Sequence, residues 1–260
     1  MGFWLVLYLG LHLLTNSQAA LWWGDEGSGF VRMVNALERL PYLHTVEVVL
    51  IGIPLLIHGV WGVHRALTSR SNDMVSGGKK PSLPYERNKA YRWQRLSSWI
   101  LLLGIVGHVI QMRFVSMPVT VMRDHQEMSV VKIGVDQGVY ALADRLDVTL
   151  LNQQDIEKFP ALASYNLRSD ERLAMADSPG KAMLFMVRDT FKSPAMVFLY
   201  TLFVLAAAFH AFNGFWTFLI TWGLILSYRA QRSMIPVCWI GAAVLSFLGL
   251  AAIFGSYWNG

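Results

Sequence analysis

The chain has 260 residues, of which 54% are hydrophobic and 15% are charged. A soluble globular domain carries about 25% charged residues, so this composition excludes an ordinary soluble protein. The net charge of +5 comes largely from one connecting segment, which argues against nucleic-acid binding. The single cysteine, Cys238, excludes an internal disulfide framework and a cysteine-rich metal site. The charges collect between long apolar stretches, which indicates a membrane protein.

Five stretches are long and apolar enough, or nearly so, to cross a bilayer, which takes about 20 apolar residues. The first lacks the basic start of a secretory signal peptide and holds His12 inside its apolar run, so we expect a true span that begins upstream of Met1. The sequence therefore predicts an all-α membrane protein with five transmembrane helices. In chain order the stretches are Gly2–Ala20, Val46–Leu67, Leu96–Met117, Pro194–Leu226 and Ile235–Gly255.

The basic residues lie in two of the connections. The connection Arg65–Arg95 carries eight Lys or Arg against two acidic residues, and the short link after the fourth stretch carries Arg229 and Arg232. The positive-inside rule places both connections in the cytoplasm. We therefore expect a multi-pass protein of the inner (cytoplasmic) membrane with a cytoplasmic N-terminus.

The segment between the third and fourth stretches is too long and too polar for a turn. We expect a small α/β external insertion there, which divides the chain into 1–117, 118–193 and 194–260. Gln137–Arg145 predicts a helix, and Pro194 suits the first turn of the next span. Local patterns predict strands at Val119–Met122, Ser129–Val135, Val148–Leu151 and Met183–Arg188.

Four of the seven histidines lie deep in four successive spans: His12, His58, His108 and His210. An imidazole without a partner is costly in hydrocarbon. For a single histidine an interhelical hydrogen bond is an equally good explanation, but one on each of four helices favours a shared purpose. Imidazole is a natural axial ligand of haem iron. Four of them predict a haem-binding bundle with two bis-histidine sites, which leave no open iron position and therefore transfer electrons.

Depth in the membrane suggests how these histidines pair. At 1.5 Å per residue, His108 lies roughly 20 Å from the cytoplasmic edge at Arg95, and His58 roughly 10 Å from the edge at Arg65. They therefore belong to different haems. His12 would share the outer level with His108, and His210, which depth alone does not place, joins His58 by elimination. His64 is turned about 120° away from the His58 face, so we favour His58 as the ligand.

A few further residues are weaker candidates. Glu47 begins the second span at the external face, where it could handle quinone protons or make a helix-end hydrogen bond. Arg95 and Arg113 lie at opposite membrane edges and could pair with haem propionates or act as interfacial anchors. His44 and His125 fall in external segments, where they are surface residues or line the quinone site.

The histidines stand within motifs that resemble the dihaem cytochrome b subunit of succinate dehydrogenase and fumarate reductase. Four such motifs occur in order, one in each of the first four spans. They are His12-Leu-Leu-Thr-Asn-Ser17; Glu47, Pro54, His58 and Gly62; Trp93-Gln-Arg-Leu-Ser97 with Gly107-His108 and Gln111-Met-Arg-Phe114; and Phe209-His210-Ala-Phe-Asn-Gly214 with Trp216-Thr217.

The resemblance implies a membrane anchor of a succinate:quinone oxidoreductase, linked to the tricarboxylic acid cycle or to fumarate reduction. It implies two haems b that carry electrons between an iron–sulfur subunit and a quinone, with menaquinone the expected one. A flavoprotein with covalent FAD and the iron–sulfur subunit would be the cytoplasmic partners, and the chain itself would not act on succinate. Ala208 stands where some fumarate reductases have a glutamate for a proton path, so such a path is not implied here.

Two other readings remain open from the sequence. One is the haem b anchor of another respiratory dehydrogenase, although such anchors tend to take two ligands from one helix. The other is a haem-free transporter or assembly protein whose histidines bind substrate or protons.

Overall fold

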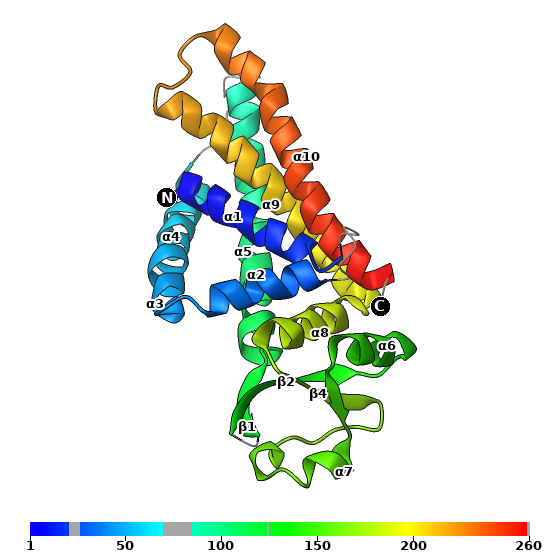
Figure 1. Cartoon of the computed structure of the whole chain (residues 1–260). Coiled ribbons are helices and arrows are strands. Elements are labelled where there is room, and N and C mark those ends of the chain that lie inside the picture. Colours follow the sequence, from blue (N-terminus) through cyan, green and yellow to red (C-terminus); the bar gives the residue numbers. More distant parts are fainter. Residues whose placement is uncertain (21–26, 70–84, 124, 259–260) are drawn as a thin grey trace. The chain divides into compact units, whose positions relative to one another are not determined.

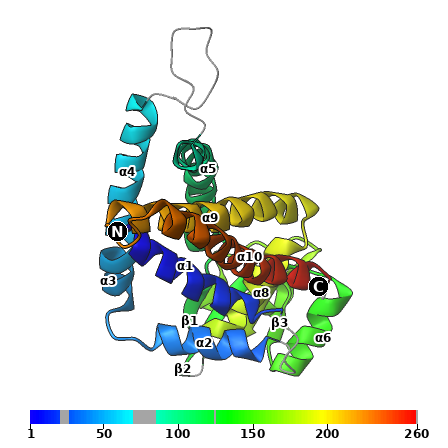
Figure 2. The same ribbon diagram turned by 90° about the horizontal axis from the view of Figure 1, so that it is seen from above.

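The computed structural model describes residues 1–20, 27–69, 85–123 and 125–258 (Figures 1 and 2). They form two compact units. The first unit comprises residues 1–13, 44–106 and 202–247, and the second comprises residues 14–43, 107–201 and 248–260. Three of the basic residues behind the predicted orientation, Arg70, Lys79 and Lys80, lie outside the described residues.

Within the described residues, four helices are long and apolar enough to cross a membrane: Leu43–Thr68, Glu86–Val115, Pro194–Thr221 and Tyr228–Trp258. They make the chain a multi-pass membrane protein. Helix α1 (Gly2–Ser17) has 16 residues. At 1.5 Å per residue it is about 24 Å long, shorter than the roughly 30 Å of bilayer hydrocarbon. A fifth span that includes α1 stays a prediction.

Two of the long helices change type near one end. Leu43–Thr68 consists of α3 (Leu43–Glu47), a π-helical segment (Val48–Gly52) and α4 (Ile53–Thr68). Helix α5 (Glu86–Val109) continues as a second π-helical segment, Ile110–Val115. Single π turns are rare and often lie at functional sites. Both lie at the span ends that the sequence predicts to be external.

The last two long helices are regular along their length. Helix α9 (Pro194–Thr221) begins at the expected proline. Helix α10 (Tyr228–Trp258) begins seven residues before the predicted Ile235 and has Pro236 inside it. The predicted span started later because Tyr228–Met234 is polar, whereas the helix continues out of the apolar stretch.

Glycines bring the helices of the first unit close together. Helices α9 and α10 lie side by side in both views (Figures 1 and 2). A Cβ on Gly241 of α10 would lie 2.2 Å from the Phe212 ring of α9, and one on Gly104 of α5 would lie 2.4 Å from the Phe203 ring of α9. Small residues at such contacts are typical of helices that pack within a membrane, because close packing replaces the hydrophobic effect there.

A four-stranded antiparallel sheet forms the centre of the second unit, with strand order β1-β2-β4-β3. Strands β1 (Val119–Arg123) and β2 (Gln126–Gly134) form a hairpin, and β4 (Glu171–Ala176) pairs with both β2 and β3 (Thr149–Leu151). In the chain, the four strands of this sheet lie between α5 and α9. The predicted boundaries of the insertion, at 117/118 and 193/194, stay a prediction.

The two faces of the sheet are covered differently, because side chains alternate along a strand. Val130 of β2 with Leu173 and Met175 of β4 join a buried cluster whose other members lie in β3 and in the segment after it, which includes α7 (Gln153–Ile156). Helix α8 (Pro179–Phe191) packs against β2 and β4, and α2 (Ser28–Glu38) packs on α8. Helix α6 (Gln137–Leu146) matches the predicted helix within one residue.

The predicted strand at Met183–Arg188 is wrong, because this segment lies inside α8. All six residues are half-buried or buried, since α8 is covered on one side by the sheet and on the other by α2. A helix buried all round lacks the polar face that marks an amphipathic helix, so its apolar run resembles that of a strand. The strand that the pattern missed is β4, whose sequence includes Glu171 and Arg172.

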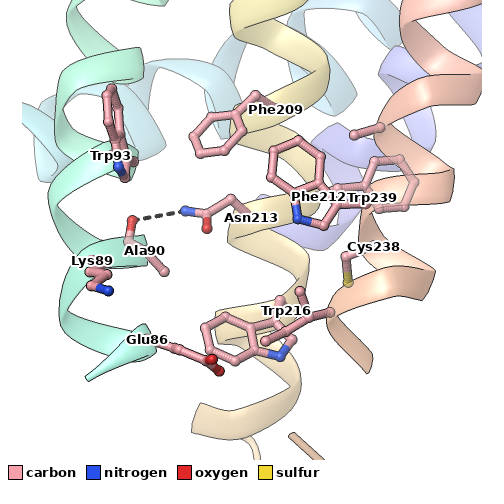
Figure 3. Close-up of a pocket in the computed structure, with 12 residues that line it drawn as sticks. Glu86, Lys89, Ala90, Trp93, Phe209, Phe212, Asn213, Trp216, Cys238 and Trp239 are labelled. Atoms are coloured by element: carbon pink, nitrogen blue, oxygen red, sulfur yellow. Dashed lines mark hydrogen bonds between the residues drawn. The ribbon is translucent and has the colours of Figure 1, made fainter. Parts of the chain in front are cut away.

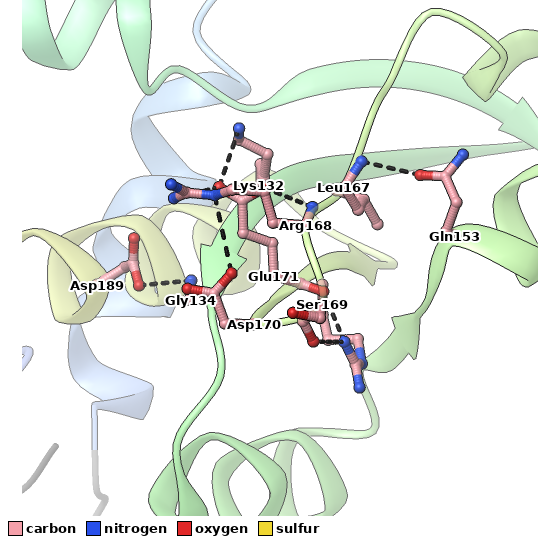
Figure 4. Close-up of polar contacts among 10 residues, drawn as sticks. Lys132, Gly134, Gln153, Leu167, Arg168, Ser169, Asp170, Glu171 and Asp189 are labelled. Carbon is pink, nitrogen blue, oxygen red and sulfur yellow. Dashed lines mark hydrogen bonds and ion pairs between the residues drawn. The ribbon is translucent and has the colours of Figure 1, made fainter.

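Glu171 explains how a charged residue fits that strand. Its carboxylate is 9% exposed and accepts hydrogen bonds from the backbone and the guanidinium of Arg168, both at 2.9 Å (Figure 4). Lys132 of β2 lies 3.2 Å away. The backbone hydrogen bond from Arg168, with these two cations, outweighs burial and lowers the pKa of Glu171 to about 2.

A second carboxylate links α6 to α8. Asp136 caps α6 by accepting from the backbone N–H of Val139 at 2.8 Å, and it pairs with Arg188 and Lys192. Burial works to raise its pKa, but these hydrogen bonds and charges lower it to about 2. Because the Arg188 side chain is only 8% exposed, Asp136 neutralises a charge that has little access to water.

We expect Asp136→Ala to destabilise the sheet unit by about 3 kcal/mol, since it removes the carboxylate that pairs with the buried Arg188 and with Lys192 and that caps α6. The measurement is protease cleavage within residues 119–191 of the purified full chain across a urea series. Asp170→Ala is the control, because Asp170 is 71% exposed, and it should change stability by no more than about 0.5 kcal/mol. Equal resistance of the two variants would contradict the proposed role of Asp136.

Candidate functional site

His210 lies in the middle of α9, and residues of α5 hold both its side chain and its backbone. The Ser97 hydroxyl lies 3.0 Å from Nδ1 of His210. Gln94, one turn before Ser97, donates from Nε2 to the His210 carbonyl at 3.1 Å. The His210 carbonyl thus accepts a hydrogen bond from a side chain of a neighbouring helix. This cross-helix contact therefore fixes the height of His210 relative to α5.

Asn213 extends the same connection one turn along α9. Its amide nitrogen donates to the Ala90 carbonyl at 3.0 Å and to Oε1 of Gln94 at 2.6 Å. The approach depends on Gly214, where a Cβ would lie 2.9 Å from the Gln94 amide nitrogen. Three polar side chains thus join α5 to α9 around the residue that the sequence singles out.

His58 of α4 faces His210 across the first unit. The two ring centroids are 6.3 Å apart and the rings are nearly perpendicular, at 84°. Helix α1 is close to the His58 ring, because a Cβ on Gly2 would lie 3.6 Å from that ring. The structure thus brings together the two histidines that depth and elimination assign to the inner site.

His108 of α5 has a hydroxyl partner of its own in the second unit. Its Nδ1 lies 3.2 Å from the hydroxyl of Tyr200 in α9, and that hydroxyl donates to Oε1 of Gln111 at 3.2 Å. The Tyr200 ring packs edge-on against Phe191 at 5.2 Å. Gln111 belongs to the π-helical segment after α5.

The pairing of His12 with His108 stays a prediction, since the two belong to different units. His12 of α1 lies beside Tyr8, with ring centroids 5.7 Å apart. His64, the rejected alternative in the second span, lies against Trp61 at 6.0 Å. His125 follows β1 with a positive φ of 66°, at the turn of the β1–β2 hairpin.

Glu47, the candidate quinone-site residue, is the last residue of α3 and directly precedes the π-helical segment Val48–Gly52. Its carboxylate lies 3.5 Å from Nδ1 of His44. The propionate candidates both lie on the third long helix, Arg95 within α5 and Arg113 in the π-helical segment that follows it, and their role stays a prediction. Arg95 donates to the Ser69 hydroxyl at 2.6 Å and covers the Tyr91 ring, and Arg113 lies in the second π-helical segment.

A cavity of about 280 Å³ opens between α5, α9 and α10 (Figure 3). Its walls are mostly aromatic, with Trp93, Phe209, Phe212 and Trp239 among them, and Glu86 and Lys89 at one end. Asn213 faces it and donates to Ala90 across it. None of the four span histidines lines this cavity, so it is separate from the His58–His210 pair.

The described residues contain no group of three or more His, Cys, Asp or Glu that could hold a bare metal ion. A haem needs only one or two axial ligands from the protein, because the porphyrin supplies the others. The His58–His210 pair is therefore the relevant arrangement for a metal in the first unit.

Several residues of the site stand within the sequence motifs, although no role was predicted for them. Gln94 and Ser97 belong to the first part of the motif in the third span, Asn213 and Gly214 follow His210 in that of the fourth, and Gln111 follows His108. Tyr200 lies outside every motif. A signal was present: polar residues that recur on the histidine-bearing side of an apolar helix need partners there.

Comparison with known proteins gives one curated relative. The chain is 26% identical over 248 residues to the succinate dehydrogenase cytochrome b558 subunit of Bacillus subtilis (strain 168), and the match covers 95% of this chain and 88% of that protein. No protein-family model matches the chain, and no solved structure does. The resemblance inferred from the histidine-bearing motifs is confirmed: over nearly its whole length, the chain is similar to a succinate dehydrogenase cytochrome b subunit.

Proposed function

We propose that this protein is the membrane cytochrome b subunit of a succinate:quinone oxidoreductase. It would carry electrons between an iron–sulfur subunit and a membrane quinone, menaquinone by preference. Two haems b would be bound, the inner one by His58 and His210 and the outer one by His12 and His108. Its partners would be the iron–sulfur subunit and a flavoprotein, both on the cytoplasmic face.

The separation of the His58 and His210 rings is the observation that carries the proposal. A metal–imidazole bond is about 2.0 Å and the ring centre lies roughly 1.1 Å behind the nitrogen, so two imidazoles on opposite sides of one metal have centroids about 6 Å apart. The observed value is 6.3 Å. The residues therefore fit a bis-histidine haem, which when bound supplies reversible one-electron chemistry at its iron.

The chain's own residues account for the rest of the site. Gln94 and Asn213 hold α5 against α9, so the His210 ring keeps its height. Close contacts at Gly104 and Gly241 pack α5 and α10 against α9. The basic side chains of Arg87, Lys89, Arg92 and Arg95 at the start of α5 suit a soluble partner on the cytoplasmic face.

The quinone site is proposed at the external end, near Glu47. Electrons that entered from cytoplasmic partners and crossed the membrane through the two proposed haem sites would leave at its far side. A π-helical segment begins directly after Glu47, and π turns often mark functional sites. The carboxylate beside His44 could exchange quinone protons with the external phase, where each charge moved is worth about 2.3 kcal/mol per 100 mV.

We expect His58→Ala to remove the inner haem and to stop electron flow from the iron–sulfur partner. His64→Ala should keep both haems, since His64 lies on Trp61 and not beside His210. The measurement is the reduced-minus-oxidised spectrum of each purified variant, with haem counted per chain. Loss of a haem from His64→Ala but not from His58→Ala would show that the wrong histidine of α4 has been chosen.

We expect Glu47→Gln to slow quinone turnover about 10²-fold, the lower range for loss of a general acid–base group, and to leave both haem spectra intact. Glu38→Gln is the control, because Glu38 ends α2 in the same external connection. Steady-state quinone reduction checks both variants. Unchanged kinetics in Glu47→Gln would remove Glu47 from the mechanism, and a quinone analogue bound at the cytoplasmic end would overturn the placement.

A further inference from the structure

Two of the four span histidines have a hydroxyl at the same ring atom. Ser97 of α5 lies 3.0 Å from Nδ1 of His210, and Tyr200 of α9 lies 3.2 Å from Nδ1 of His108. The two contacts come from different residue types, different helices and different units. A neutral imidazole carries its proton on one nitrogen and a lone pair on the other. A hydrogen bond at Nδ1 therefore also determines whether Nε2 has the lone pair that a metal needs.

The position of the hydroxyl proton decides which nitrogen of His210 can bind iron. Ser97 has one hydrogen, and its hydroxyl donates to the Gln94 carbonyl at 3.1 Å. It therefore offers a lone pair to His210, so Nδ1 must carry the ring proton. That leaves the lone pair on Nε2. In the opposite arrangement Ser97 would donate to Nδ1, the contact with the Gln94 carbonyl would lose its hydrogen, and a protonated Nε2 could not bind a metal.

The same count applies to His108. The Tyr200 hydroxyl donates its one hydrogen to Oε1 of Gln111, so it accepts from Nδ1–H of His108. The lone pair of His108 is then also on Nε2. Ser97 is 6% exposed, so no water competes freely for its hydroxyl and the arrangement of protons is fixed by the three groups themselves.

We propose that Ser97 is a positioning residue for the inner haem ligand, an inference that rests on the proposed function. By accepting the Nδ1 proton of His210, Ser97 fixes the tautomer and the rotation of the ring and makes Nε2 a stronger electron donor. A more basic imidazole stabilises ferric over ferrous iron and so lowers the reduction potential. Tyr200 has the corresponding role toward His108.

Three substitutions test the role of Ser97 in the full chain. Ser97→Ala removes the acceptor and should weaken haem retention at the inner site about 10- to 100-fold and shift the inner midpoint potential upward. Ser97→Thr keeps a hydroxyl that can bond the same carbonyl and should restore both properties. Ser98→Ala is the matched control, since Ser98 makes the same kind of bond, to the Arg95 carbonyl at 2.8 Å, and should change neither property.

The readouts are an optical redox titration, which resolves the two haems, and the rate at which apomyoglobin removes haem from each variant. A purely structural role would lower stability without an upward shift in the midpoint potential that Ser97→Thr reverses. If Ser97→Ala does not fold, Ser97→Cys replaces the hydroxyl by a weaker acceptor of similar size and should shift the potential the same way.

The inference is overturned if Ser97→Ala and Ser97→Cys leave the inner potential and haem retention unchanged, or if Ser98→Ala shifts them equally. That result is distinct from failure of the proposed function. If only the inference about Ser97 fails, the unmodified chain still holds two haems. If the proposed function fails, the unmodified chain holds no haem at all.

Discussion

A neutral imidazole carries a proton on one nitrogen and a lone pair on the other, and inside a membrane both need a partner. The rest of this structure depends on that requirement. Ser97 and Tyr200 provide the partner at Nδ1 for His210 and His108. That arrangement leaves the lone pair of each ring on Nε2. This division of the two nitrogens distinguishes a ligand from a histidine that only ties two helices together.

Helix packing also holds the His210 ring in place. The Gln94–His210 and Asn213–Gln94 hydrogen bonds fix α5 against α9, and Gly214 lets Gln94 approach. Glycine contacts at Gly104 and Gly241 set the spacing of three helices around this point. The sheet of the second unit is stabilised separately, by ion pairs of Asp136 and Glu171, whose carboxylates stay charged because their pKa values are about 2. Close helix packing thus stabilises the first unit and ion pairs stabilise the second, while the polar side chains within the spans lie next to the histidines.

Much of this could be predicted from the sequence, because a bilayer imposes length and charge rules that act locally. The position of Pro194 predicts the start of α9, and the polar pattern of Gln137–Arg145 predicts α6. Met183–Arg188 was predicted wrongly, since burial on all sides erases helical periodicity. Ser97 and Tyr200 could not be assigned, because their role depends on contacts between helices that are over 90 residues apart in sequence. The pairing of His12 with His108 needs the same kind of information.

We propose that four imidazoles on four helices bind two haems b, each between two histidines. The most direct test is pyridine haemochrome analysis of the purified full chain, with protein quantified by amino-acid analysis. We expect two b haems per chain and a low-spin spectrum for both in the oxidised and reduced states. A value of zero would contradict haem binding by this chain altogether, and a single haem would contradict the pairing of all four histidines.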